Sequence, residues 1–271
     1  MRARDHAHEF AEERRAHILE IVNARGRVLV TELADQLRVT QPTIRKDIST
    51  LDQQGKLRRT HGGALAAKPS HEIQIDSRRS ANAEGKRRIA KACLSLINQN
   101  DSIFIDSGTT GLAIAEALVE ATDAATTAGP RFGASLNVLT NSVPVARALA
   151  NVGSIRHALL GGQYRPIADS LVGPLALQAA KQFTVNLAFI GVTGISGNQF
   201  NVADLAEADV KRAMIERAHR VVVPMDSTKT GLTDFVTLCD LSDVSALVTD
   251  AEDPRLSGLC KSRGVDLIVA P

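Results

Sequence analysis

From residue 102 to the end of the chain, short apolar runs alternate with segments of helical periodicity, and this alternation strongly restricts the fold. The strand-like runs lie at 102–106, 136–140, 156–162, 186–192, 220–225, 246–250 and 266–271. Helical patterns lie at 83–97, 108–121, 142–151, 171–183 and 204–218. Strands that are apolar along their whole length are typical of sheets covered on both faces. Their alternation with helices predicts an α/β domain with a mainly parallel sheet.

The first 67 residues follow a different pattern. Apolar positions at helical spacing predict helices at about 9–24, 31–39 and 40–54, with Thr31 opening the second and Thr40 as the N-cap of the third. A basic alternating stretch then contains a Gly62-Gly63 turn and predicts a small hairpin. This order predicts a winged helix-turn-helix, and the alternative is a three-helix bundle with a solvated basic face.

The two sides of the third helix differ in character. Ile44, Ile48 and Leu51 have the spacing of a buried face. The opposite side and its flanks carry donors and positive charge but almost no acid: Pro42, Thr43, Arg45, Lys46, Ser49 and Gln53. Residues 1–68 hold 13 Lys and Arg against 9 Asp and Glu, whereas the rest of the chain holds 19 against 21. This basic N-terminal segment, here called the head, permits contact with nucleic acid without proving it.

These patterns divide the 271 residues into a winged helix-turn-helix at 1–67, a linker at 68–82 and an α/β domain at 83–271. The three cysteines form no CxxC pair and the seven histidines form no spaced set, so we expect neither a metal site nor a cofactor. The sequence shows no signal-peptide pattern and no apolar stretch of the ~20 residues that cross a bilayer. We therefore expect a cytoplasmic protein that does not bind a membrane.

Polar residues follow the predicted strands at the ends where parallel sheets bind ligands. The segment Asp106-Ser107-Gly108-Thr109-Thr110 joins the first strand to a helix. Its backbone N–H groups, its two Thr hydroxyls and the helix dipole form an anion site, which a phosphate could approach closely at Gly108. The GxxxxGK[ST] pattern of a P-loop is absent. The alternative is ordinary N-capping, worth ~1 kcal/mol per cap.

Further polar residues follow the later strands. Asn141 and Ser142 offer short donors, and Arg165, which follows a Gly161-Gly162 pair, could bind a phosphate or lie on the surface. Glu207 and Lys211 are four residues apart on one helix, where the alternative is a surface ion pair worth ~0.3 kcal/mol. Asp226 and Lys229 lie at a strand end, where they would bind sugar hydroxyls or serve as base and acid.

The sequence resembles the DeoR family of bacterial regulators of sugar metabolism over nearly its whole length. In the head, the resemblance rests on TELADQLRVTQPTIRKDISTLDQQGKLRRTHGGA at 31–64, a long and specific match to the family's helix-turn-helix signature. In the body, it rests on IFIDSGTT (103–110), LTNS (139–142), GGQYR (161–165), EADVKRAMIERA (207–218) and DSTK (226–229). The resemblance implies a transcription factor, usually a repressor, whose effector domain is similar in fold to ribose-5-phosphate isomerase. It also implies an effector that is a phosphorylated sugar or a sugar-like metabolite.

The resemblance assigns roles to individual positions. The DNA-binding residues would be Thr40, Gln41, Thr43, Arg45, Lys46, Ser49, Arg58, Arg59 and His61. The effector-binding residues would be Asp106, Ser107, Gly108, Thr109, Thr110, Asn141, Ser142, Gly162, Arg165, Glu207, Lys211, Asp226 and Lys229. The sequence departs from the family in a short segment at 197–204, which puts a role for Asp204 in question, and in a longer loop at 121–133. Both departures concern the identity of the effector.

Three functions follow from these observations. The favoured one is a repressor of a carbohydrate-metabolism operon that binds double-stranded operator DNA as a homodimer or homotetramer and is released by a phosphorylated sugar. The alternative is a sugar-phosphate isomerase-like enzyme with a DNA-binding head, although fold alone does not carry chemistry. The third is an adaptor whose basic head binds a protein. We expect a regulator and no enzymatic activity.

Overall fold

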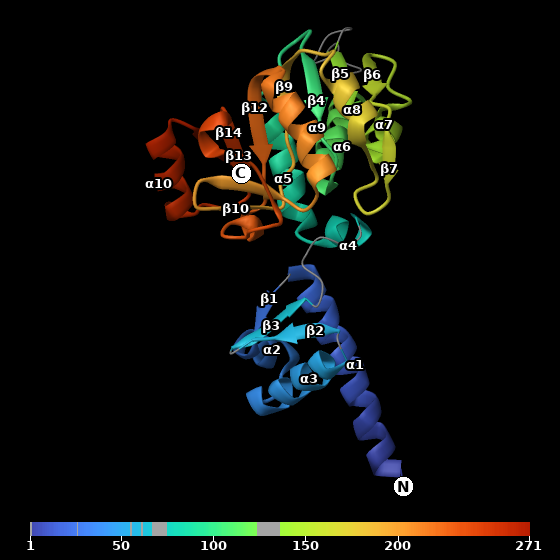
Figure 1. Cartoon of the computed structure of the whole chain (residues 1–271), viewed down its shortest axis with the longest axis vertical. Coiled ribbons are helices and arrows are strands. Elements are labelled where there is room, and N and C mark those ends of the chain that lie inside the picture. Colours follow the sequence, from blue (N-terminus) through green and yellow to red (C-terminus); the bar gives the residue numbers. More distant parts are fainter. Residues whose placement is uncertain (1, 26, 55, 61, 67–74, 124–135) are drawn as a thin grey trace. The chain divides into compact units, whose positions relative to one another are not determined.

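The computed structural model of the chain describes residues 2–25, 27–54, 56–60, 62–66, 75–123 and 136–271 (Figure 1). The chain divides into two compact units, residues 1–73 and 74–271. Helix α4 (Ile75–Ser80) lies within the segment 68–82 that the sequence assigns to a linker, and α5 (Ala83–Leu94) follows it. The domain bounds given above stay a prediction.

The N-terminal unit has three helices and a three-stranded antiparallel sheet. Its elements are α1 (Arg2–Arg25), β1 (Arg27–Leu29), α2 (Val30–Leu37), α3 (Gln41–Gln53), β2 (Leu57–Arg59) and β3 (Gly63–Ala66). The strand order is β1-β3-β2. The buried residues Ile18 of α1, Leu33 of α2 and Ile44, Ile48 and Leu51 of α3 belong to one apolar core, which confirms the predicted inward face of α3. The unit is a winged helix-turn-helix.

The start of α2 and the first strand differ from the sequence prediction. Helix α2 begins at Val30 rather than Thr31, because the backbone N–H of Leu29 donates to the Glu32 carboxylate over 3.4 Å and closes the first turn. Residues 27–29, for which the sequence analysis predicts no element, form β1 and pair with β3. This approach requires Gly63, where a Cβ would collide with the carbonyl of Val28.

The C-terminal unit is built on a seven-stranded sheet in which every pair of neighbours is parallel. Its strands are β4 (Ser102–Ile105), β5 (Leu136–Thr140), β6 (Ile155–Leu159), β9 (Val185–Phe189), β12 (Ala218–Pro224), β14 (Ala246–Thr249) and β15 (Asp266–Val269). Its other helices are α6 (Thr109–Asp123), α7 (Val143–Leu149), α8 (Gly173–Ala180), α9 (Leu205–Glu216) and α10 (Pro254–Arg263). The predicted α/β class is confirmed.

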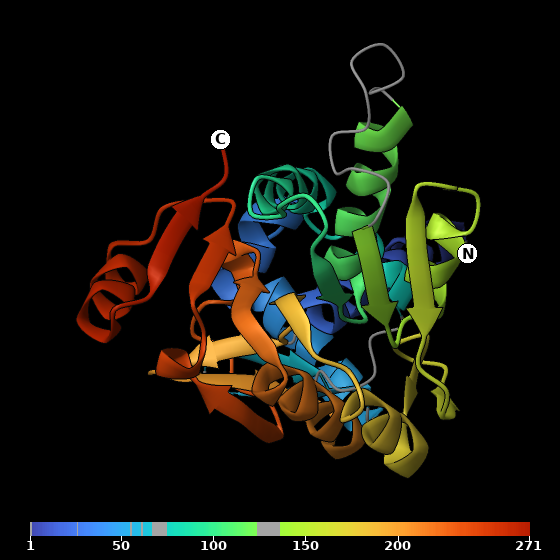
Figure 2. The same cartoon turned by 90° about the horizontal axis from the view of Figure 1, so that it is seen from above.

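Each face of this sheet packs against its own set of helices (Figure 2). Successive residues of β4 point to opposite faces: Ile103 and Ile105 belong to the core beneath α5, α6 and α7. Phe104 belongs to the core beneath α8, α9 and α10. Burial on both faces explains why central strands such as β4 and β9 are apolar along most of their length.

Several short antiparallel strands were not predicted. Strands β7 (Gln163–Arg165) and β8 (Ser170–Val172) pair as a hairpin, so the segment predicted to be largely helical from 171 starts as a strand. Strands β10 (Gly194–Ser196), β11 (Gln199–Val202) and β13 (Val236–Asp240) form a small separate sheet.

The strand order places a topological switch point between β4 and β9. The order is β15-β14-β12-β9-β4-β5-β6, so the chain runs outward from β4 through β5 to β6 and then crosses back to β9. Because ligands of open α/β sheets bind outside the carboxyl ends of the strands at such a point, the residues after β4 and β9 mark the expected site.

Within the described residues, no helix combines the length and the apolar character needed to cross a membrane. The same part of the chain contains no cluster of three or more His, Cys, Asp or Glu side chains arranged to hold a metal ion.

Candidate functional sites

The start of α3 presents the predicted DNA-binding side chains to solvent. Thr40, Gln41, Arg45 and Lys46 are exposed, and Thr43 and Ser49 are half-buried. Thr40 precedes the helix as predicted, although its hydroxyl lies 2.9 Å from the Thr43 hydroxyl and makes no capping bond to the backbone. A polar, accessible helix start after a three-residue turn is the arrangement that enters a major groove.

A buried carboxylate that the sequence analysis did not single out anchors α3 to α1. The Asp47 residue is 3% exposed, and its oxygens accept from Arg14 Nε over 2.6 Å and from Arg15 Nε over 3.1 Å. The signal was present in the sequence, because Asp47 lies three residues after Ile44, on the buried side of the helix. The pair of arginines fixes the direction of the helix that carries Arg45 and Lys46.

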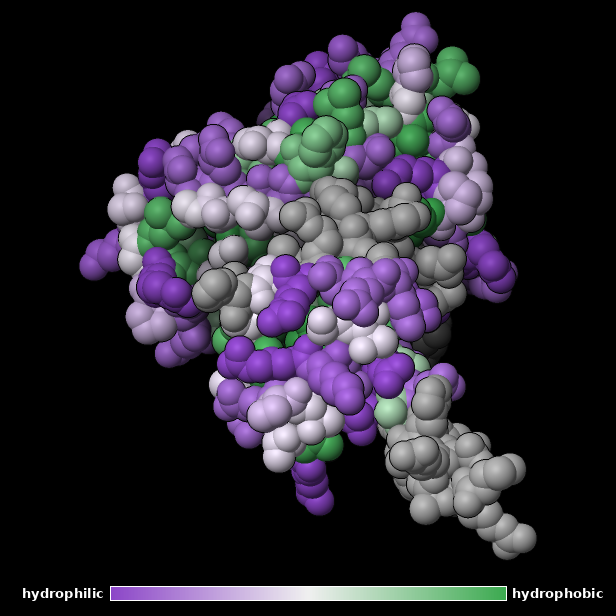
Figure 3. Space-filling view, turned by 60° about the horizontal axis from the view of Figure 1, so that its bottom comes forward, coloured by the Kyte–Doolittle hydropathy of each residue, from purple (hydrophilic) through white to green (hydrophobic). Residues whose placement is uncertain are grey.

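The predicted wing is formed by β2 and β3, which pair antiparallel. Arg59 is exposed, and its backbone N–H donates to Asp52 Oδ1 over 3.0 Å, which ties β2 to the end of α3. Arg58 lies on the same strand, and His61 lies outside the described residues. Hydrophilic and intermediate colours cover most of the described surface of this unit that faces the viewer in Figure 3.

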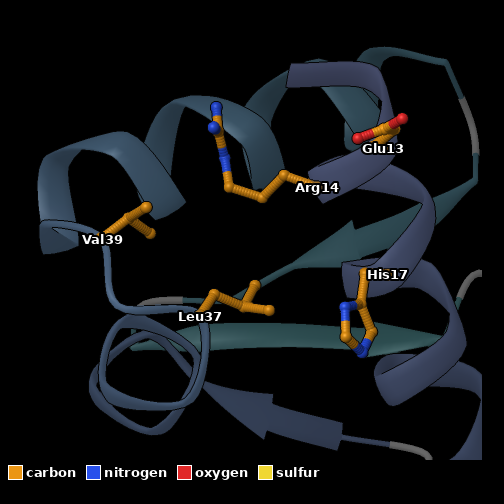
Figure 4. Close-up of a pocket in the computed structure, with 5 residues that line it drawn as sticks. All are labelled: Glu13, Arg14, His17, Leu37 and Val39. Carbon is orange, nitrogen blue, oxygen red and sulfur yellow. The ribbon is translucent and has the colours of Figure 1, made fainter. Parts of the chain in front are cut away.

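A hollow of about 310 Å³ lies between α1 and the turn that leads to α3. It is lined by Glu13, Arg14 and His17 of α1 and by Leu37 and Val39 near the end of α2 (Figure 4). None of the predicted effector residues lines it, so this hollow is not the effector site that the sequence predicts.

The predicted effector residues of the C-terminal unit gather at the switch point. Asp106 follows β4, is 1% exposed and accepts from the backbone N–H of Gly191 over 2.9 Å and from the ammonium group of Lys211. A Cβ at position 191 would lie 3.0 Å from the carbonyl of Ser107 and 3.3 Å from the Asp106 carboxylate, so the close approach favours glycine. We call Asp106, Asn141, Arg165, Glu207, Lys211, Asp226 and Lys229 the strand-end cluster.

The loop between β4 and α6 provides donors next to this carboxylate. The backbone N–H of Ser107 donates to Asn141 Oδ1 over 3.1 Å, and Gly108 has a φ of +109°, a value that L side chains rarely adopt. Thr109 begins α6, and the buried hydroxyl of Thr110 has no hydrogen-bond partner among the described residues. An unpartnered hydroxyl at a helix N-terminus fits an anion site better than ordinary N-capping does.

Two predicted residues make contacts that hold the fold together. The Ser142 hydroxyl accepts from the backbone N–H of Val145 over 3.4 Å and caps α7. A Cβ on Gly162 would lie 2.6 Å from the carbonyl of Val172 and 2.9 Å from the Ala176 side chain. The observed role of each of these two residues is therefore packing or capping, and their contact with an effector stays a prediction.

Glu207 and Lys211 do not form the surface pair that their spacing allows. The Glu207 carboxylate accepts from Arg165 Nη1 over 2.9 Å, whereas Lys211 is 3% exposed and binds Asp106. Asp204 caps α9 by accepting from the backbone N–H of Glu207, and its other oxygen lies 3.6 Å from Arg165 Nε. The two residues of α9 thus reach different partners in the same cluster.

Asp226 and Lys229 follow β12 and complete the cluster. Lys229 Nζ donates to the carbonyl of Val192 over 2.8 Å and lies 3.9 Å from the Asp226 carboxylate. Burial lowers the pKa of Lys229 to about 8; Asp226 opposes this shift, and the positive charges of Lys86, Arg78 and Lys211 add to it. A lysine in such surroundings gains from the arrival of an anion.

The sequence analysis missed two cations beside this cluster, Arg78 and Lys86, because they fall in or near the predicted linker. Burial lowers the pKa of each, with nearby carboxylates opposing the shift. The basic run RRSANAEGKRR at 78–88 was their only signal in the sequence.

Comparison with known proteins places the chain in a family. Residues 14–70 match the model described as the DeoR-like helix-turn-helix domain, and residues 81–251 match the DeoR C terminal sensor domain. The chain belongs to the DeoR family. This membership confirms the predicted resemblance and, with it, the prediction of a DNA-binding transcriptional regulator rather than an enzyme.

Relatives in this family match the chain over most of its length. The lactose phosphotransferase system repressor of Streptococcus mutans is 31% identical, with 89% of this chain and 93% of the relative covered. The glycerol-3-phosphate regulon repressor of Escherichia coli K12 is also 31% identical, with 89% and 92% covered. Among solved structures, ribose 5-phosphate isomerase A of Methanocaldococcus jannaschii matches 55% of each chain at 14% identity and a TM-score of 0.39.

Proposed function

We propose that this DeoR-family regulator is a repressor of a carbohydrate-metabolism operon and that a phosphorylated sugar releases it from its operator. The observation that carries the proposal is the polar cluster at the switch point, where the N–H donors of the β4–α6 loop, Lys211 and Lys229 converge. The relatives named as repressors of the lactose phosphotransferase system and of the glycerol-3-phosphate regulon support the same reading.

In this proposal the N-terminal unit reads double-stranded DNA with α3 and the wing. The exposed side chains at the start of α3 reach base edges, and those on the wing contact phosphates. The proposed DNA-binding residues are Thr40, Gln41, Thr43, Arg45, Lys46, Ser49, Arg58, Arg59 and His61.

The effector lies at the carboxyl ends of the strands. Its phosphate accepts hydrogen bonds from the loop Ser107-Gly108-Thr109-Thr110 and from a lysine, and its hydroxyls meet carboxylates and amides of the strand-end cluster. The proposed effector residues are those of the β4–α6 loop from Asp106 to Thr110, together with Asn141, Ser142, Gly162, Arg165, Glu207, Lys211, Asp226 and Lys229.

Release follows from linkage between the two units. An effector lowers operator affinity only if it binds the DNA-incompetent state more tightly than the competent one. A single recognition helix makes few phosphate contacts and binds weakly, so we propose that a homodimer or homotetramer presents paired helices to repeated half-sites.

The test is a binding experiment with two readouts on the full chain. Thermal unfolding is measured with glucose 6-phosphate, fructose 1-phosphate, ribose 5-phosphate and glycerol 3-phosphate, and a gel shift uses the DNA upstream of the protein's own gene. A stabilising compound should also release the DNA. Thr109→Val should keep operator affinity but blunt release; normal release in this variant would refute the phosphate site.

A further inference from the structure

Helix α4 is the first described element of the C-terminal unit, and the chain enters it directly from residues 67–74. Arg78 lies on α4, and Lys86 lies on α5, one helix further along. Neither residue is among the predicted effector-binding residues. Their contacts tie α4 to α5 and to the loop that follows Arg165 of the strand-end cluster.

Lys86 holds the end of α4 in place. It is 5% exposed, and its ammonium group donates to the carbonyl of Arg78 over 2.8 Å and to the carbonyl of Ala81. Asn82, four residues before Lys86, donates to Asp250 Oδ2 over 2.8 Å, and Asp250 follows β14. The corner between α4 and α5 is therefore tied to the carboxyl ends of the sheet.

The Arg78 guanidinium is only partly satisfied by the protein. Its Nη2 donates to the carbonyl of Ile167 over 3.0 Å, in the loop between β7 and β8 that begins after Arg165. Its Nε is buried and has no hydrogen-bond partner among the described residues. Buried donors are nearly always paired, so Arg78 Nε is a donor that a bound ligand would satisfy.

The carboxylate whose charge acts most on Arg78 is already engaged. Glu207 is the leading favourable charge near Arg78, but its oxygen accepts from Arg165 Nη1 over 2.9 Å. The structure shows no ion pair within 4.0 Å between Arg78 and a described carboxylate. Lys229, which the charges of Lys86 and Arg78 also reach, pairs only loosely with Asp226. Asp234 also acts on Arg78, but no described carboxylate accepts a hydrogen bond from its Nε, so this buried donor is free to bind an anion from outside the chain.

We propose that Arg78 is a further effector-binding residue, whose guanidinium donates to a phosphate monoester held at the strand-end cluster. This inference rests on the proposed function and adds a residue of α4 to the proposed effector site.

The test compares Arg78→Gln and Arg78→Lys with a matched control on the same helix, Arg79→Gln. The Arg79 side chain is 60% exposed and pairs with Glu116 over 2.7 Å, so its removal deletes a neighbouring positive charge without touching the cluster. Isothermal titration of each full-length variant uses inorganic phosphate, the most stabilising sugar phosphate of the panel above, and the same sugar without its phosphate. Operator affinity without ligand and circular dichroism check that each variant is folded.

We expect Arg78→Gln to weaken binding of phosphate and of the sugar phosphate at least about tenfold, because a charge-assisted donor is lost. Arg78→Lys should weaken it about threefold or more, since an ammonium group does not reproduce the guanidinium fork. Arg79→Gln should stay within about twofold of the wild type, as expected for an exposed pair. Weakening for the sugar phosphate but not for inorganic phosphate would contradict a contact between Arg78 and the phosphate group.

Affinities of both Arg78 variants that match the wild type would overturn the inference while leaving the proposed function intact. If Arg78→Gln fails to fold, unchanged affinity of the folded Arg78→Lys overturns it in the same way. If the wild type binds neither inorganic phosphate nor any compound of the panel, the phosphate site of the proposed function fails, and the role of Arg78 fails with it.

Discussion

The ammonium group of Lys229 sets an upper pH limit for anion binding at the proposed site. Its pKa of about 8 means that it loses its proton as the pH rises above that value, and an anion then loses a cationic partner. A phosphate monoester gains its second charge near pH 6, so we expect the tightest binding between about pH 6 and 8. Above that range, affinity should fall by up to about tenfold per pH unit. Isothermal titration with the sugar phosphate from pH 5.5 to 9.5 measures this profile.

Unfolding cannot produce the same alkaline loss through Lys229. Because its pKa is lowered from the ordinary 10.5, the unfolded chain holds more protons than the folded chain between about pH 8 and 10.5. This group therefore makes the folded state more stable as the pH rises through that window. Lys229→Arg keeps its charge and should lack the alkaline fall. A wild-type affinity that stays constant from pH 7 to 9.5 would remove Lys229 from the phosphate contact.

A second prediction at this scale concerns Arg45, an exposed side chain in the first turns of α3. If Arg45 binds a guanine edge, Arg45→Ala should weaken operator binding by roughly 1–3 kcal/mol and relax sequence preference at one position. Gln53→Ala, at the far end of the same exposed face, serves as the control and should have little effect. Fluorescence anisotropy with operator DNA measures both, and an unchanged midpoint for Arg45→Ala would exclude this residue from base recognition.

At the scale of elements, the attachment of α3 to α1 depends on one buried carboxylate. Asp47→Asn removes the charge that Arg14 and Arg15 share, and both arginines keep 22% of their side chains exposed and can be rehydrated. We therefore expect a moderate cost of about 1–3 kcal/mol, at or below that of breaking a fully buried pair. Hydrogen exchange should show faster exchange for amides of α1 and α3 and no change for β4 and β9. The control is Asp35→Asn on exposed α2 surface, and equal protection in both variants would contradict the anchoring role.

The elements also show what sequence patterns can and cannot predict. Apolar strands such as β4 and β9 can be recognised in the sequence because both of their faces are buried. Helix α3 can be recognised from the spacing of Ile44 and Ile48. Strands of three residues such as β7 and β10 contain too few positions for a period, and their pairing depends on partners elsewhere in the chain.

The same limit applies to the candidate site. Asp106 follows from the rule for parallel sheets, and the structure brings Lys211 of α9 into contact with it. Arg78 does not follow from that rule, since it comes from a helix at the start of the unit and contacts the loop after Arg165 only through tertiary packing. Its role in binding stays a proposal that the sequence pattern could not supply.

At the scale of the whole molecule, the chain joins a DNA-reading unit to a sensor unit, and its regulation is a coupling free energy between two ligands. The effector and the operator bind to different units, so neither can displace the other by competition for the same atoms. The proposed release of the operator must then come from a change in the balance between two states of the chain. Thermodynamic linkage then requires the effect to be reciprocal.

This reciprocity gives the last prediction. If a saturating sugar phosphate weakens operator binding by a given factor, typically about 5–150-fold, saturating operator DNA must weaken sugar-phosphate binding by the same factor. Two titrations on the full chain measure the two factors, anisotropy for the operator and calorimetry for the sugar phosphate. Arg78→Gln should reduce both factors together, because the contact that it removes belongs to the effector-bound state. A sugar phosphate that releases the operator but binds equally well to the free and the DNA-bound protein would contradict a linkage between these two sites alone.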